Sequence, residues 1–466
     1  GRIRQSGASG SDTWKAFPPP GPGEVAAGGV FLKRANLGSA TSTANGTKAD
    51  VFVARFAADG NFRWARSAGG TKPDYAWAVG VDAGDNCYLT GQFYGTASFG
   101  STMLTARGGT TTLSDIYVAK LGPSGDFVRT VQAGGDDQDV AYGIAVDPAG
   151  GCYVTGRFRQ YAAFGSIGVS MRGSADSEDG FIAKLDASGD WSWLQQFGST
   201  GSNFASTGGV DVELIGGSRV IFAASILGTA SMGGTTIATG GLISSFVAAL
   251  DSNGSILGIT PMIASGSTRI SSLATAPGQK IIACGGYKGT LAYGPSVLEP
   301  RSPYSADENL FIASVGMNGE ALWAMGGVGT GDDVARSVVC DQSLDGHCHV
   351  FAEVSDNTRF GSQTLSPSVG GPLVVAELLP RGSFTAAASY AEWFAGLAAA
   401  ADRGNSTKVE AQDDFDGDGV PNLMEFAFGL DPLKPEGGSG TAAFLDLDGR
   451  MSMSFLMRKD PASLHY

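Results

Sequence analysis

The stretch DVFVARFAADGNFRW, residues 50–64, decides the fold because it returns along the chain. It recurs as DIYVAKLGPSGDFVR from Asp115 and as DGFIAKLDASGDWSW from Asp179. Weaker copies begin at Ser245, Asn309 and Pro372. Successive copies start 65, 64, 66, 64 and 63 residues apart. So regular a spacing indicates an internal repeat of about 64 residues.

Each repeat contains four short runs in which apolar, β-branched or aromatic residues alternate with others, separated by Gly, Asp, Asn, Ser and Pro. This pattern predicts four strands joined by turns, and a repeated four-stranded unit is the blade of a β-propeller. We take GIAVD, residues 143–147, as an innermost strand and FRWARSAGG, residues 62–70, as an outermost strand. The surplus sequence between the second and third strands, such as residues 96–114, predicts extended loops on one face.

The predicted fold class is therefore all-β, with a β-propeller over residues 1–389. Six four-stranded blades are counted, and a seventh is left open by the residues before Gly7. The innermost strands are expected to begin near Asp12, Asp74, Asp139, Thr207, Arg269 and Asp333.

Three recurring patterns resemble the SBBP-type bacterial β-propeller repeat: DxFVAKL followed by Gly, DxAxxIAVD, and GxxYVTG. The resemblance covers residues 7–389 and is strongest in the second and third units. The fourth unit departs from it, because Asn203 replaces the recurring Asp. The resemblance implies a propeller and an extracytoplasmic location, and it brings no catalytic residues, since a fold does not by itself give a function.

The composition of the chain argues against one class of binding partner. The chain carries 71 Gly, 16% charged residues and a net charge of -14, and it has no basic stripe, so no nucleic acid is expected as a partner. No apolar run is long enough to cross a bilayer, and we expect a monomer. We expect an extracellular or cell-surface protein whose signal and anchor lie outside this segment.

After the propeller, residues 390–436 read as a helix followed by an EF-hand-like calcium loop, and residues 437–466 read as the start of a further β-rich module. The segment DFDGDGVPNLME matches the pattern in which alternate oxygens of a tight loop surround Ca²⁺. It resembles dockerin-like and thrombospondin-type-3-like loops. The predicted ligands are Asp414, Asp416, Asp418, the carbonyl of Val420, Asn422 and Glu425.

Other polar and aromatic residues recur with the repeat and are interpreted as architecture. One Asp set opens the innermost strands and a second set follows them, as in turns capped by a carboxylate. The tryptophans of the outermost strands, such as Trp193, are expected to stack against the next blade. Cys340 and Cys348 flank a short turn, where a disulfide is geometrically feasible. The second Asp set is Asp82, Asp147 and Asp341.

No catalytic motif is present, and only three His exist. The sequence therefore predicts a non-catalytic binding or scaffold module with a structural calcium, whose propeller face takes an unknown protein or polysaccharide ligand. The alternative is a carbohydrate-active propeller enzyme, a glycosidase or lyase, with carboxylates at the central channel, because such carboxylates leave no local sequence signature.

Overall fold

The computed structural model describes residues 13–386, with gaps at 18–24, 33, 38–39, 44–47, 58–60, 109–112, 175–176, 199–207, 301–306, 341–347, 356–357, 361–362, 366–372 and 379–383. The described part is all-β, as predicted, and contains no helix. The helix and calcium loop predicted in residues 390–436, and the module predicted in residues 437–466, lie outside it.

Six antiparallel groups of four strands, here called sheets although hairpin strands join some of them to a neighbour, follow one another along the chain, and each runs from an innermost to an outermost strand. The first three, in that strand order, are β1 (Thr13–Phe17), β2 (Val25–Leu32), β5 (Ala49–Phe56), β6 (Phe62–Gly70); β7 (Asp74–Val81), β8 (Cys87–Tyr94), β11 (Ser114–Leu121), β12 (Phe127–Ala133); and β13 (Val140–Val146), β14 (Cys152–Phe158), β17 (Asp179–Leu185), β18 (Trp191–Gly198). The last three are β19 (Gly208–Ile215), β20 (Arg219–Met232), β21 (Thr235–Leu250), β22 (Ile256–Ala264); β23 (Thr268–Ala276), β24 (Lys280–Tyr287), β27 (Asn309–Val315), β28 (Ala321–Val328); and β29 (Val334–Cys340), β30 (Cys348–Glu353), β33 (Leu373–Leu378), β34 (Phe384–Ala386).

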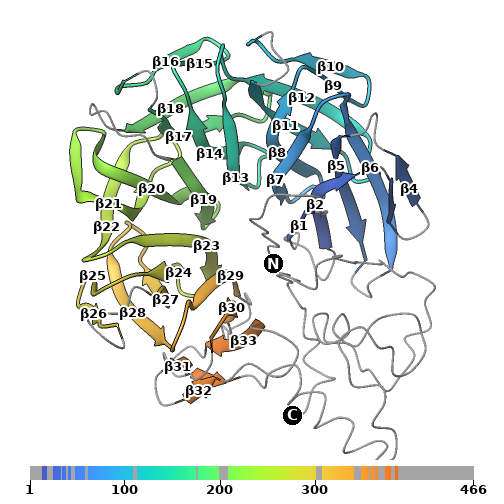
Figure 1. Ribbon diagram of the computed structural model, residues 1–466. Coiled ribbons are helices and arrows are strands. Elements are labelled where there is room, and N and C mark those ends of the chain that lie inside the picture. Colours follow the sequence, from blue (N-terminus) through green and yellow to red (C-terminus); the bar gives the residue numbers. More distant parts are fainter. Residues whose placement is uncertain are drawn as a thin grey trace, which may run out of the picture.

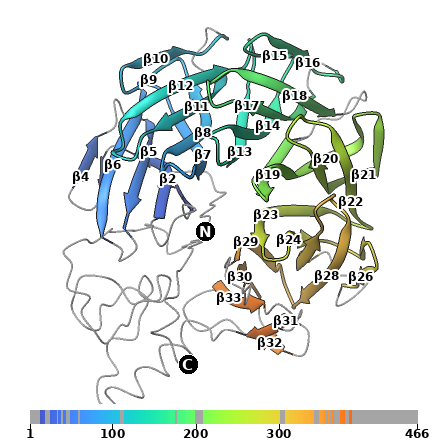
Figure 2. The same ribbon diagram turned by 180° about the vertical axis from the view of Figure 1, so that it is seen from behind.

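The six sheets lie side by side in an arc around a common centre, with their first strands toward that centre (Figure 1; seen from behind in Figure 2). This is a β-propeller-like arrangement, and it confirms the predicted order of strands within each unit. The innermost strands begin within one residue of the six predicted positions. Residues before Thr13, on which a seventh blade depends, lie outside the described part.

The surplus sequence between second and third strands forms hairpins, whereas the sequence predicted loops on one face. Several of these hairpins reach the outermost strand of the preceding sheet. Thus β9 (Thr96–Phe99) pairs with β6 through Gly70 and Ala97, and β20 pairs with β18 through Phe197 and Met232. The hairpin strands are β3 (Arg34–Leu37), β4 (Ala40–Thr43), β9, β10 (Thr102–Thr105), β15 (Tyr161–Phe164), β16 (Ile167–Ser170), β25 (Leu291–Tyr293), β26 (Ser296–Leu298), β31 (Thr358–Phe360) and β32 (Gln363–Leu365).

A second kind of contact joins the first sheet to the second and the third sheet to the fourth. The indole Nε1 of Trp64 on β6 donates a 2.8 Å hydrogen bond to the carbonyl of Pro123, in the β11–β12 turn. Trp193 on β18 likewise donates to the carbonyl of Ser252 at 3.0 Å. At both turns a Gly lies flat on the indole, where a side chain would collide with the ring. These contacts confirm that the outer tryptophans serve packing.

The recurring Asp residues cap the backbone, as predicted. Asp74 accepts a 2.7 Å hydrogen bond from the backbone N–H of Gly70, and Asp139 accepts the equivalent bond from Gly135 at 2.7 Å. In the second set, Asp82 accepts from Gly84 and Asn86 at 2.9 Å. Recurrence of these bonds makes them part of the architecture. Asp341 lies outside the described residues.

The disulfide that the sequence allowed is present between Cys340 and Cys348, whose Cα atoms are 3.9 Å apart. The two residues face each other across the β29–β30 pair. Cys87 and Cys152 are buried free thiols, which confirms their interpretation as core residues.

Candidate functional site

The innermost strands share a local irregularity. In β7, β13, β19, β23 and β29, one residue is skipped in the pairing with the second strand, which is the geometry of a β-bulge. A bulge re-aims one side chain away from the regular alternation. The skipped residues are Trp77, Tyr142, Val210, Ser271 and Arg336, and all are partly exposed. The architecture repeats at this position, whereas the chemistry does not.

Two adjacent bulges carry aromatic rings that continue into a row. Tyr75 and Trp77 stack with ring centroids 5.8 Å apart and planes 13° apart, and Tyr142 lies 5.8 Å from Trp77. Tyr94 meets the free end of Tyr75 edge-on at 6.4 Å. We call Tyr94, Tyr75, Trp77 and Tyr142 the aromatic row. The indole Nε1 of Trp77 is buried and has no acceptor among the described residues.

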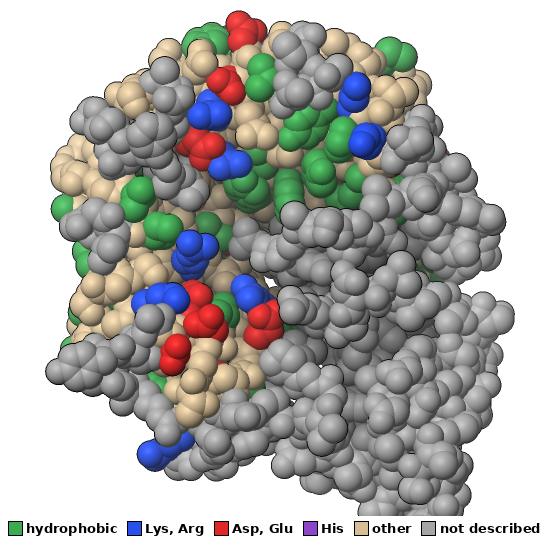
Figure 3. All heavy atoms as spheres, viewed as in Figure 1, with side chains coloured by type: hydrophobic (Ala, Val, Ile, Leu, Met, Phe, Trp, Pro, Cys, Tyr) green, Lys and Arg blue, Asp and Glu red, His purple; other side chains and the backbone are tan. Residues whose placement is uncertain are grey.

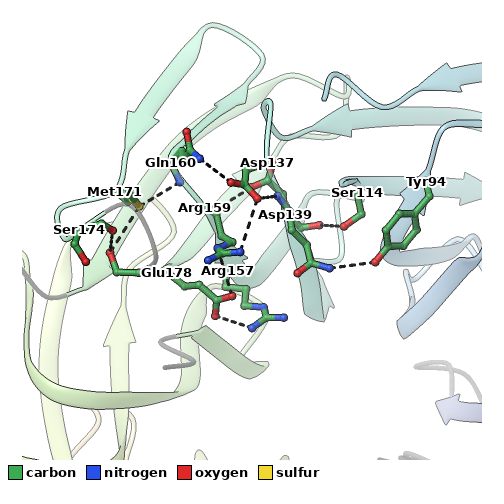
Figure 4. Close-up of polar contacts among 12 residues, drawn as sticks. Tyr94, Ser114, Asp137, Asp139, Arg157, Arg159, Gln160, Met171, Ser174 and Glu178 are labelled. Carbon is green, nitrogen blue, oxygen red and sulfur yellow. Dashed lines mark hydrogen bonds and ion pairs between the residues drawn. The ribbon is translucent and has the colours of Figure 1, made fainter. Parts of the chain in front are cut away.

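A charged group continues the row on the third sheet. The guanidinium of Arg157 lies 5.7 Å from the ring centre of Tyr142 and donates a 2.6 Å hydrogen bond to Glu178. Arg159 lies 4.0 Å from Glu178 and 4.0 Å from Asp137, so one guanidinium stands between two carboxylates (Figure 4). Asp137 also accepts a 2.8 Å bond from Gln160. Glu178 and Asp137 are only 13% and 16% exposed, so both carboxylates are held in fixed positions.

The innermost strands of the fifth and sixth sheets carry cationic side chains at positions equivalent to those of the aromatic row. Arg336 occupies the bulge of β29 and is bonded to Glu353 at 2.6 Å. Arg269 on β23 is two residues before the bulge, as Tyr75 is on β7. Figure 3 shows hydrophobic side chains gathered over β7 and β13 beside one group of acidic and basic side chains, with a second such group over β23, β24 and β29.

The most strongly shifted carboxyls lie elsewhere, between the sheets. Burial raises the pKa of Asp139 from 3.8 to about 8, and the nearby charge of Asp115 adds to the increase although a bond from Gly135 opposes it. Burial likewise raises the pKa of Asp74 to about 7 and that of Asp115 to about 6. All three are fully buried and recur with the repeat. They are structural carboxyls, because a substrate cannot reach them.

The predicted calcium ligands Asp414, Asp416, Asp418, Val420, Asn422 and Glu425 lie outside the described residues. Within the described ranges, no group of three or more His, Cys, Asp or Glu side chains is placed to hold a metal ion. The part of the chain that the structure describes also contains no helix with the length and apolarity needed to span a bilayer.

Sequence reasoning missed the aromatic row and its charged neighbours. Trp77 and Tyr142 occupy the same position in two aligned repeats. They were missed because the alignment was searched for residues that match between units, and these two differ. A signal was available in the aligned repeats. It was a position that is flanked by matching residues but is occupied by a different side chain in each unit. Glu178 and Asp137 lie outside the innermost strands and gave no such signal.

Comparison with protein-family models gives no match, and comparison with curated proteins gives none either. Among solved structures, the chain is similar to a chimera of apocarotenoid oxygenase (ACO) and RPE65, with a TM-score of 0.35, 13% identity and 82% of each chain covered. It is similar to a mutant of the Synechocystis apocarotenoid oxygenase, with a TM-score of 0.34, 12% identity and 82% of each chain covered.

Both similar structures are those of enzymes, and the prediction of a non-catalytic scaffold, with the expectation that the chain is not an enzyme, is wrong on this comparison. At these scores the likeness carries no substrate or metal of the oxygenases over to this chain. The resemblance to SBBP-type repeats stays a prediction.

Proposed function

We propose that the protein is a carbohydrate-active enzyme, a glycosidase or lyase, which binds a polysaccharide across the aromatic row. The observation that supports this most directly is the continuity of the row with the Arg157–Glu178 pair at one end of the innermost strands. Sugar rings present C–H faces that pack on aromatic faces, and their hydroxyl groups bond to carboxylates and guanidinium groups. The row offers the first kind of contact and the charged group offers the second.

Glu178 and Asp137 are the carboxylates that such chemistry requires. In hydrolysis, one carboxyl group protonates the leaving oxygen while the other activates water or attacks the sugar. In elimination, a carboxylate takes the proton beside a uronate carboxyl group, the C–O bond breaks as the C=C bond forms, and the same carboxyl group returns the proton to the leaving oxygen. Arg157 and Arg159 orient the two carboxylates for either route.

The test is depolymerisation of a panel of neutral and acidic polysaccharides by the full chain. Glu178→Gln keeps an oxygen for Arg157 and removes the charge, so turnover should fall on the order of 10²-fold or more while binding persists. Trp77→Ala should weaken binding itself. Glu320→Gln and Tyr161→Ala change an exposed carboxylate and an exposed ring away from the row and should change neither quantity. Undiminished turnover in Glu178→Gln and Asp137→Asn would overturn the proposal.

We also propose that residues 414–425 bind Ca²⁺ through Asp414, Asp416, Asp418, Val420, Asn422 and Glu425, which the spacing of the sequence supports. An extracytoplasmic location is proposed with it. The Cys340–Cys348 disulfide supports that location, because disulfides persist mainly in oxidising compartments. We also propose that the protein is a monomer and that its repeats are of the SBBP type. Both proposals rest on the sequence alone.

A further inference from the structure

The two sides of the candidate site differ in character. On β7 and β13 the positions at and before the bulge hold Tyr75, Trp77 and Tyr142, whereas on β23 and β29 they include Arg269 and Arg336. An aromatic side and a side that carries two guanidinium groups, one of them paired with Glu353, thus lie around the same strand ends, in a chain whose net charge is -14. We infer that the substrate is an anionic polysaccharide built of uronic acid units, which stacks on the aromatic row and places carboxylates on the guanidinium groups. This inference rests on the proposed function.

Arg269 supports an anionic ligand because its charge is uncommitted. It is exposed, and it has no acidic partner among the described residues. Arg336, by contrast, is bonded to Glu353. An unpaired guanidinium offers a planar fork of N–H donors that matches the two oxygens of a carboxylate.

The other end of the site contributes donors without acceptors. The Nε–H of Arg157 and the Nε1–H of Trp77 are both buried, and neither meets an acceptor in the described part of the chain. Tyr142 lies between them, in contact with both side chains. The exposed faces of Trp77 and Tyr142 and the remaining N–H groups of Arg157, rather than these two buried nitrogens, are what a ligand can contact.

The overall negative charge does not exclude such a ligand. At physiological ionic strength, charges farther apart than about 8 Å are largely screened, so local guanidinium groups decide the contact. The same screening predicts that added salt weakens binding of the polyanion and leaves a neutral polymer unaffected.

The experiment compares polygalacturonate with the same polymer fully methyl-esterified, which removes the negative charge and keeps the sugar chain. Affinity electrophoresis and calorimetry with the full chain should show that the acid form binds at least about tenfold more tightly, the equivalent of one charge-assisted hydrogen bond. Arg269→Ala should remove about tenfold in affinity for the acid form and nothing for the ester. Arg359→Ala, which removes an exposed Arg from the peripheral strand β31, is the matched control and should change neither.

The outcomes separate the two proposals. Equal binding of acid and ester, or an Arg269→Ala variant identical to the parent, overturns the uronate inference. Cleavage confined to neutral polysaccharides also overturns it and leaves the carbohydrate-active function intact. Failure to bind or cleave any member of the panel overturns the proposed function itself.

Discussion

Pairs of Asp side chains lie buried between neighbouring sheets and share their surroundings with a Gly. Asp115 on β11 and Asp139 before β13 enclose Gly134, where a Cβ atom would lie 2.8 Å from Asp115 Cγ and 2.8 Å from Asp139 Oδ2. The φ angle of Gly134, 138°, adds strain for any other residue. Two carboxyls so close in a dry site cannot both ionise easily, because burial and like charge both favour the protonated form.

This arrangement makes stability depend on pH with a definite sign. The folded-state pKa of Asp139 is about 8, above its ordinary value of 3.8, so the folded state binds the extra proton. The contribution is fully present below 3.8 and is lost as pH rises through about 8. Asp74, with a pKa of about 7, acts in the same direction. We expect the melting temperature to fall between about pH 5 and about pH 9.

Asp139→Asn isolates one site, because the amide imitates the neutral carboxyl and can still accept the hydrogen bond from Gly135. Its melting temperature should exceed that of the parent at about pH 9 and approach it at about pH 5. Asp251→Asn should instead melt below the parent by a similar amount at both pH values, because hydrogen bonds from Ser255 lower the pKa of Asp251 from 3.8 and the carboxylate is ionised across this whole range. Parallel melting curves for parent and Asp139→Asn across this range would refute the assignment.

At the scale of elements, two kinds of contact join neighbouring sheets. Hairpins pair with the outermost strand of the preceding sheet, and side chains of the outermost strands pack on a turn of the following sheet. Trp64 illustrates the second kind, since its buried indole covers Gly125 and donates to the carbonyl of Pro123. Trp64→Ala should lower the free energy of unfolding by about 3 kcal/mol, the cost of removing a buried aromatic side chain. Trp64→Phe should lower the free energy of unfolding by less than Trp64→Ala does. It loses the hydrogen bond to Pro123 but keeps an aromatic ring over Gly125. Urea denaturation measures both, and equal losses would show that ring packing contributes nothing.

The sequence predicted these strands well because alternation and turn residues are local signals. The repeat fixed which segments are equivalent, and analogy with other propellers placed GIAVD innermost and FRWARSAGG outermost. The destination of residues 96–105 was not predictable in the same way, since pairing of β9 with β6 joins strands of two different units. The position of a bulge could not be predicted from the sequence either, because the extra residue Trp77 changes neither the composition nor the period of the repeat. The candidate site depends on those bulges, and for that reason it emerged only with the structure.

At the scale of the whole molecule, the six sheets give a scaffold in which repeated residues hold the architecture and unrepeated ones diversify one end of the innermost strands. Trp77, Tyr142 and Arg336 stand at equivalent backbone positions and differ completely in chemistry. A ligand that lies across several sheets therefore meets aromatic, carboxylate and guanidinium groups in turn. Blade number is a property of this scale too, and residues before Thr13 decide it.

The calcium segment provides a prediction for the chain beyond the propeller. Four carboxylates within residues 414–425 repel one another strongly without a cation, and a bound Ca²⁺ removes that repulsion. Limited proteolysis should therefore cut residues 405–430 faster in chelator than at about 10⁻³ M Ca²⁺, which fills extracellular sites of this kind. Asp416→Ala combined with Glu425→Ala should abolish the protection, while the melting of residues 13–386 stays unchanged because both substitutions lie outside the repeat. If parent protein is cut alike with and without Ca²⁺, the loop does not bind the metal; if Ca²⁺ shifts the main melting transition, the segment is coupled to the sheets rather than separate from them.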